Sequence, residues 1–279
     1  MIGNLFSTIS EMLSFTFMMR AAIVGVMVSL CASLLGVSLV LKRYAMIGTG
    51  LSHVGFMALI VAAAVDFTPL FVSLPVVLGA AFLLLRLNEN NKIKGDSAVA
   101  LISASSFAIG VILASQTTGM GVHTCTAMFG SILATTRADV QISVGLSVAV
   151  ILLFVLSYKQ IFAITHDEDF AQATGTKAGL YKTLLALLTA VTVVLGMRMM
   201  GALLISSLII FPALTAMRLC RSFLSVVIVS AIIGVVCFFI GITISYGLDW
   251  PTGATVVAVN LAVFIIFSAV GAVRKGGFS

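Results

Sequence analysis

Long apolar runs separated by short polar interruptions extend over almost the whole chain. Each run is close to the roughly 20 residues that a helix needs to cross a membrane. Backbone groups in lipid must satisfy their own hydrogen bonds, and the runs do not break into short alternating strands. The pattern therefore predicts an all-α polytopic bundle. About nine membrane segments are expected, at 15–41, 45–66, 69–87, 97–117, 140–158, 183–199, 201–217, 222–247 and 251–273.

The stretch between the fourth and fifth runs is less apolar than its neighbours. Residues 118–139, with Gly119 and Arg137 near their ends, are too short and too polar for a full span. We predict a re-entrant or interfacial helix here, which returns to the side from which it enters. The stretch also contains His123 and Cys125, whose two-residue spacing is by itself only a weak indication of a metal site.

The basic residues predict how the segments are oriented. Placing the Lys42-Arg43 turn in the cytoplasm puts 12 of the 15 lysines and arginines inside. Arg20, Arg137 and Arg198 then lie outside. Because loops that stay in the cytoplasm carry an excess of Lys and Arg, this split predicts an outside N-terminus and an inside C-terminus. A full span over 118–139 would reverse the predicted orientation of every later segment.

Small residues recur at helical spacing on two of the predicted spans. Gly25, Ser29 and Ser33 lie four residues apart on the first span, and Ser230 and Gly234 repeat the spacing on the eighth. Side chains this small let helix backbones approach closely in a membrane. We interpret both rows as packing surfaces.

The composition excludes a soluble domain and a nucleic-acid-binding protein. Of the 279 residues, 61% are hydrophobic and 9% are charged, against about 25% charged in soluble domains. The net charge of +6 comes from the loops and follows from the orientation rule rather than from a basic surface. The four cysteines are scattered and are interpreted as packing residues. The chain is thus expected to form a single transmembrane domain, 1–279.

The largest predicted cytoplasmic loop, 159–182, contains a short helix with clear end signals. Thr165 and Glu168 fit a capping box, and Gly175 suits the C-terminal cap. This helix is either a solvated linker or a docking element for a cytoplasmic partner. Its first turn is acidic, as the helix dipole favours, with Asp167, Glu168 and Asp169.

The sequence carries no enzyme signature. It has no HExxH, no GxSxG and no clustered Cys and His residues. The P-loop pattern GxxxxGK[ST] is also missing, since the chain contains no Gly-Lys dipeptide. If ATP drives this protein, a separate subunit must bind and hydrolyse it.

His53 stands about eight residues inside the second predicted span. An ionisable residue at that depth is costly and by default marks a functional site. The alternative is a neutral imidazole that is hydrogen-bonded to a neighbouring helix. Asp66 and Asp249 fall at the outer ends of spans, where they are interfacial or contribute to an outer gate.

Four stretches, spread over nearly the whole chain, carry a family resemblance through their order and spacing. They are LKRYAMIGTGLSHVGF (41–56), THDEDFAQATG (165–175), GALLISSLIIFPALTA (201–216) and SYGLDWPTGAT (245–255). In these stretches the chain resembles the membrane permease subunits of bacterial ABC importers for zinc, manganese or iron. The first stretch is similar to the family's basic turn with Gly-Asp-x-x-Ser/Ala-His, and the second to its acidic-Ala-x-x-Gly segment. The third is similar to its Gly-Ala-Leu-Leu helix and the fourth to its Ser-Tyr…Asp-x-Pro turn, and Phe129-Gly130 also fits its Leu-Phe-Gly element.

The resemblance implies a homodimeric permease in the bacterial cytoplasmic membrane, with two ATPases and an extracytoplasmic metal-binding protein. It also implies a metal-handling pair one helical turn apart, of which His53 is present while Thr49 replaces the family's Asp. Manganese suits carboxylates and zinc suits imidazole, so we expect zinc as the transported ion, with no permanently bound cofactor. The ATPase-coupling residues implied are Asp167, Glu168, Asp169, Phe170, Ala171 and Gly175.

Other functions fit the same residues. A manganese or iron importer of the same family needs the same architecture. A proton-coupled secondary transporter would use His53 and perhaps Asp66 and would work without an ATPase. A chelate permease would need a wider pathway without an intramembrane ligand. A membrane scaffold or sensor would carry no cation flux at all.

Overall fold

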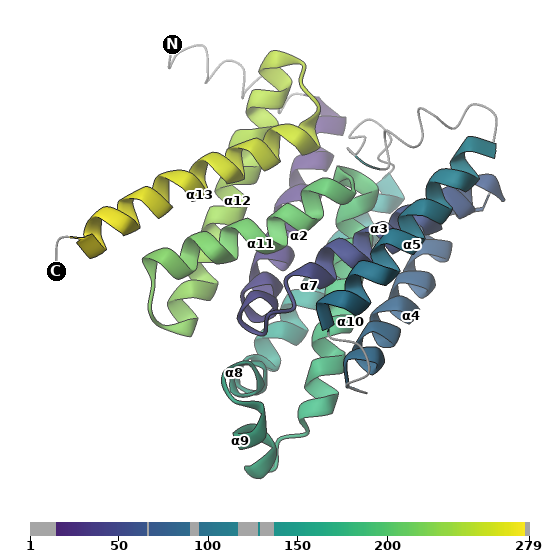
Figure 1. Ribbon diagram of the computed structural model, residues 1–279. Coiled ribbons are helices and arrows are strands. Elements are labelled where there is room, and N and C mark those ends of the chain that lie inside the picture. Colours follow the sequence, from purple (N-terminus) through teal and green to yellow (C-terminus); the bar gives the residue numbers. More distant parts are fainter. Residues whose placement is uncertain (1–14, 66, 90–94, 117–127, 129–136, 277–279) are drawn as a thin grey trace.

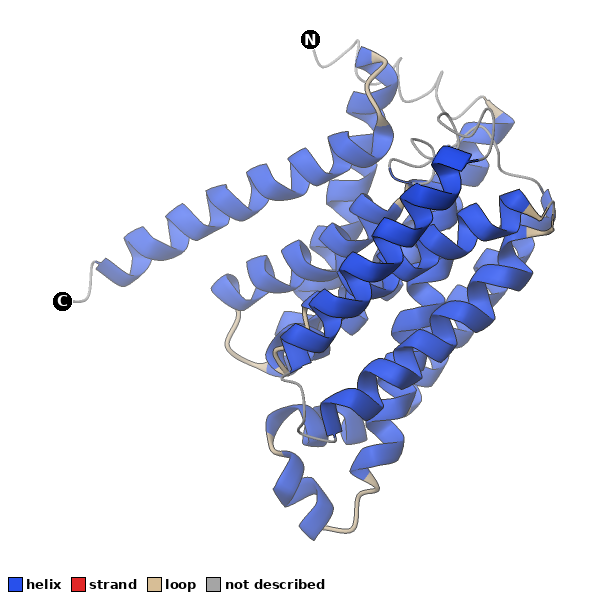
Figure 2. Ribbon diagram, turned by 45° about the vertical axis from the view of Figure 1, so that its right-hand side comes forward, coloured by secondary structure: helices blue, strands red, loops and turns tan. Residues whose placement is uncertain are grey.

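The computed structural model describes residues 15–65, 67–89, 95–116, 128 and 137–276. Within these residues, nine helices are long and apolar enough to cross a membrane, which confirms the nine predicted segments. Figure 2 shows helices joined by short loops. The nine are α2 (Thr16–Leu41), α3 (Met46–Ala64), α4 (Pro69–Glu89), α5 (Gly95–Gln116), α7 (Arg137–Leu156), α10 (Ala178–Met200), α11 (Ala202–Leu219), α12 (Phe223–Leu248) and α13 (Thr252–Gly276).

Helix α2 lies at the centre of the bundle and packs against α7, α10, α11 and α12 (Figure 1). The two rows of small residues predicted as packing surfaces form the contact between α2 and α12. A Cβ on Gly234 would collide with the Ser33 hydroxyl, and Ser230 Oγ donates a hydrogen bond to the Ser33 carbonyl at 3.1 Å. Gly36 is in similarly close contact with the backbone carbonyl of Ile209 on α11. Close backbone approach therefore holds the centre of the bundle together.

The loop between α7 and α10 differs from the expected single short helix. It contains two helices, α8 (Tyr158–His166) and α9 (Glu168–Ala173), and α10 begins at Ala178, inside the predicted loop. The expected capping box is also wrong. Thr165 Oγ1 donates to the carbonyl of Ile161 within α8, while the Asp167 side chain caps α9 by accepting from the Phe170 N–H at 3.0 Å. Because the Thr165 hydroxyl is bonded within α8, the cap of α9 comes from Asp167 instead.

Ion pairs at the two ends of α10 show which of the predicted loops lie at the same end of the bundle. Near its start, Lys182 forms an ion pair with Glu168 of α9, and Glu168 also pairs with Lys42 after α2. In its last turn, Arg198 forms an ion pair with Asp139 in the first turn of α7, at 2.7 Å. The end of α2, helix α9 and the start of α10, all predicted to be cytoplasmic, thus meet at one end of the bundle, the lower end in Figure 1.

Several sequence predictions fall on residues outside the described part of the chain. Asp66 and His123 belong to this group, as does most of the predicted re-entrant segment 118–139. The last three residues of that segment instead begin α7. Which end of the bundle faces the cytoplasm stays a prediction.

Candidate functional site

One face of α3 presents polar and aromatic side chains toward a cavity. This face begins at Thr49 and continues three, four and seven residues later with Ser52, His53 and Phe56. Residues at these spacings lie on a single face of a helix. Ser52 Oγ donates to the Thr49 carbonyl at 2.8 Å, which satisfies its proton within the helix. The face combines an imidazole, two hydroxyls and an aromatic ring.

His53 is joined to the neighbouring helix α5 by a hydrogen bond. Its Nδ1 lies 2.6 Å from the Oγ of Ser103, so the structure contains the interhelical bond that we considered as the alternative to a pathway role. The Phe107 ring, one turn further along α5, lies with its centroid 5.1 Å from that of the imidazole. With the ring proton on Nδ1, Ser103 accepts it and Nε2 keeps its lone pair. Ligand binding and interhelical bonding are therefore compatible.

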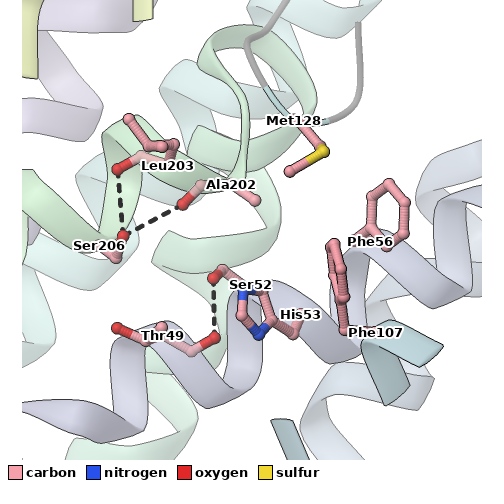
Figure 3. A pocket seen from close by; sticks show the side chains of 9 residues that line it. All are labelled: Thr49, Ser52, His53, Phe56, Phe107, Met128, Ala202, Leu203 and Ser206. Atoms are coloured by element: carbon pink, nitrogen blue, oxygen red, sulfur yellow. Dashed lines mark hydrogen bonds between the residues drawn. The ribbon is translucent and has the colours of Figure 1, made fainter. Parts of the chain in front are cut away.

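A cavity of about 170 Å³ lies between α3, α5 and α11, and His53 forms part of its wall (Figure 3). That volume has room for a cation with several of its water molecules. The lining residues are Thr49, Ser52, His53, Phe56, Phe107, Met128, Ala202, Leu203 and Ser206.

Gly201 determines how α11 reaches the cavity. It separates α10 from α11 and has φ +86°, a left-handed conformation that glycine adopts without strain. The chain changes direction there, and the first residues of α11, Ala202 and Leu203, reach the cavity wall. The glycine of the GALL stretch thus has a structural role beside the cavity.

The donor set of the cavity suits a transient cation better than a stored one. No group of three or more His, Cys, Asp and Glu side chains able to hold a metal occurs among the described residues. The lining supplies one imidazole, hydroxyls of Thr49, Ser52 and Ser206, and the thioether of Met128. A cation here would keep water ligands, and weak coordination permits release.

The second candidate site is α9, at the end of the bundle. Its Phe170 is 65% exposed, and Asp169 beside it is also exposed, whereas Ala171 is fully buried. Gly175 follows the helix with φ +87°, and the Thr176 N–H donates to the Ala171 carbonyl at 2.9 Å. This is the glycine-terminated ending expected from the sequence. The helix therefore presents one outward face and one face toward the bundle.

The structure brings together only some of the predicted site residues. Thr49 and His53 share the cavity. Asp249 is exposed at the C-terminal end of α12, in the turn at the opposite end of the bundle from α9 (Figure 1), and does not line the cavity. Its role in an outer gate stays a prediction.

Sequence reasoning missed Ser103, Phe107 and Ser206, because they belong to other spans than His53. The cluster of serines at 103, 105 and 106 in an apolar run was an available signal. It did not indicate which serine faces the histidine.

Comparison with known proteins agrees with this architecture. The chain is 26% identical over 265 residues to the manganese transport system membrane protein MntC of Halalkalibacterium halodurans, covering 95% of this chain and 91% of that one. It is 26% identical over 272 residues to the chelated iron transport system membrane protein YfeD of Yersinia pestis, covering 95% and 89%. The solved structure of PsaBC from Streptococcus pneumoniae in complex with Fab matches with a TM-score of 0.83 at 26% identity, covering 96% and 95%.

The match to a protein family extends over nearly the whole chain. The model of the ABC 3 transport family matches residues 14–271, from before α2 into α13. The first eight apolar helices, most of α13, the cavity and α9 fall within the matched range. The chain belongs to the ABC 3 transport family.

Proposed function

We propose that the chain is the permease subunit of an ATP-driven importer of divalent transition-metal ions, with zinc preferred. The observation that carries this function is the His53 imidazole on the wall of an intramembrane cavity, held by Ser103 through Nδ1. A cation that loses part of its hydration shell needs a ligand inside the membrane, and a histidine held in this way supplies one without closing the site.

The preference for zinc rests on the ligands available in the cavity. Imidazole and thioether donors, present as His53 and Met128, suit zinc, whereas carboxylate and water ligands suit manganese. No carboxylate occurs among the lining residues in the described part of the chain, and Thr49 stands one helical turn before His53. Manganese and iron remain the second candidates, because the relatives named above are a manganese and a chelated-iron transport protein. The volume of about 170 Å³ is small for a bulky chelate, which favours the free ion.

Transport proceeds by alternating access in an assembly with other subunits. Two permease copies, two cytoplasmic ATPases and an extracytoplasmic metal-binding protein complete the importer. The exposed Phe170 side of α9 docks on the ATPase. The ATPase supplies the energy, because the permease has no P-loop motif with which to bind ATP itself. The permease breaks no covalent bond; it opens the cavity to one side of the membrane at a time.

The decisive experiment is metal uptake by the reconstituted complex. Wild type and His53→Ala are compared for ATP-dependent uptake of zinc, manganese and iron, with Met57→Ala as control. Met57 lies one turn further along α3 and outside the cavity lining. We expect zinc uptake in wild type and the control, and its loss in His53→Ala with subunit assembly intact.

Each alternative function predicts a different result. Uptake that persists without ATP and collapses with the proton gradient would indicate a secondary transporter. Uptake of manganese or iron in place of zinc would support the importer function but refute the preference for zinc. No metal uptake under any condition would refute the proposed function.

A further inference from the structure

A single carboxylate joins three helices at the end of the bundle where α9 lies. Glu168, the first residue of α9, forms an ion pair through Oε2 with Lys42 Nζ at 3.2 Å and through Oε1 with Lys182 Nζ. Lys42 directly follows α2, and Lys182 lies near the start of α10. The two lysines are 126 and 14 positions away from Glu168 in the chain, so the tertiary fold brings the three residues together.

This cluster is turned toward the bundle rather than toward solvent. The side chain of Lys42 is 8% exposed, that of Lys182 17% and that of Glu168 31%. Lysine is almost never buried to this extent without a partner. The next two residues of α9, Asp169 and Phe170, are exposed instead. Glu168 is thus on the inner face of α9, and its neighbours are on the outer face.

Apolar packing attaches α9 to the bundle only weakly. Ala171 packs with Ile164 of α8 and Ala178 of α10 in a small cluster that is separate from the main hydrophobic core. That cluster contains no residue of α2. Among the described contacts, the pairing of Lys42 with Glu168 therefore connects α9 to the central helix.

We propose that Glu168 is a positioning residue that transmits the movement of α9 to α2 and α10, and that it does not itself bind the ATPase. This inference rests on the proposed function. Two charge-assisted contacts hold one carboxylate between two helices, so α9 cannot shift without pulling on both. Helix α10 ends at Met200, and Gly201 then leads directly into the residues of α11 that line the cavity. Movement at α9 thus has a direct route along α10 and through Gly201 to the cavity wall.

The test measures the number of metal ions transported per ATP hydrolysed in the reconstituted complex. Glu168→Gln keeps the shape of the side chain and removes its charge. We expect the ATPase to remain bound and active while the transport ratio falls by about tenfold, within the lower part of the usual range for coupling between sites. Asp139→Asn is the matched control: it removes the charge of a carboxylate that pairs with Arg198 at the other end of α10, and it should keep the wild-type ratio.

A second pair of variants covers the case in which Glu168→Gln fails to fold. Lys182→Met removes one of the two ion pairs and leaves the other, and we expect an intermediate ratio. Lys177→Met is its control, because Lys177 is exposed and forms none of the ion pairs described here.

The outcomes separate this inference from the proposed function. A wild-type ratio in Glu168→Gln or in Lys182→Met overturns the inference while leaving the importer intact. Loss of ATPase binding in Glu168→Gln, with binding kept in Asp139→Asn, makes Glu168 a docking residue and also overturns the inference. Absence of ATP-dependent metal uptake in the wild type is a different result, which refutes the proposed function itself.

Discussion

The Nδ1 atom of His53 and the Oγ atom of Ser103 lie 2.6 Å apart and join α3 to α5 beside the cavity. A hydrogen-bond partner on one ring nitrogen fixes the tautomer of the imidazole and the direction in which the other nitrogen points, as it does for histidine ligands of metals generally. Under the proposed function, we expect Ser103 to orient the imidazole for a passing cation without touching that cation.

Replacing Ser103 by Ala should weaken metal uptake by about 10-fold or more in apparent affinity, because the imidazole loses its orienting partner. The measurement is the concentration dependence of uptake in proteoliposomes. Ser105→Ala is the matched control, since Ser105 Oγ is exposed and donates to the Leu101 carbonyl of its own helix at 2.7 Å. Ser103→Thr, which keeps a hydroxyl, should restore most of the affinity. Equal uptake in Ser103→Ala and wild type would contradict the prediction.

Thr49→Asp should raise manganese uptake relative to zinc several-fold. The change places a carboxylate one helical turn before His53, on the wall of the same cavity, and carboxylate oxygens suit manganese. Competition between the two metals in one uptake assay measures the ratio directly. Thr49→Asn adds the same bulk without the charge and should leave the ratio near that of wild type. If both variants change the ratio alike, size rather than ligand chemistry is responsible.

Gly36→Ala should destabilise the bundle by about 1–3 kcal/mol, the usual effect of overpacking. A Cβ at this position meets the backbone carbonyl of Ile209, which cannot rotate away as a side chain can. Thermal unfolding of the purified protein in detergent should show a melting temperature lower by several degrees. Gly79→Ala is the control, because a Cβ there has open space around it. An unchanged melting temperature for Gly36→Ala would show that α2 and α11 can move apart without loss.

The ion pairs of Glu168 should give a pH-dependent contribution to stability. Burial alone would raise the pKa of Glu168, but the hydrogen bond from Lys182 and the charge of Lys42 outweigh it and hold the pKa below its ordinary value of 4.5. A lowered carboxyl pKa stabilises the folded state fully above the unfolded value, and this contribution is lost as the pH falls through the folded value.

The difference in melting temperature between wild type and Glu168→Gln should therefore be constant from neutral pH down to about 4.5 and shrink below it. Thermal unfolding of both proteins over this pH series measures the difference in melting temperature. The contributions of the other carboxylates are common to both proteins and cancel in this difference. A difference that grows with acidity would assign the effect to another group.

Asp167→Ala should loosen α9 by about 1 kcal/mol, as removal of an N-cap does. The readout is hydrogen exchange at the Phe170 amide, whose N–H donates to Asp167 Oδ1 at 3.0 Å. Thr165→Ala should leave that amide protected, because the Thr165 hydroxyl bonds within α8. Equal exchange in the two variants would contradict the observed cap.

The sequence by itself determined the nine membrane helices and the loop that carries α9. Both depend on local properties: the length of an apolar run, the residues that end a helix and the side on which basic residues gather. The ending at Gly175 was also predictable, because a left-handed residue after a helix is a local requirement that glycine meets. His53 could be singled out for the same reason, as an ionisable residue within an apolar run.

Only the tertiary structure decided which side chains meet. Three serines, at 103, 105 and 106, lie close together on α5, and the packing of α3 against α5 selects the first as the partner of His53. Likewise, the acidic run of α9 gives no sign that Glu168 turns inward to Lys42 and Lys182 while Asp169 stays exposed. Such contacts depend on the rotation and offset of one helix against another, and close packing over the whole bundle sets both.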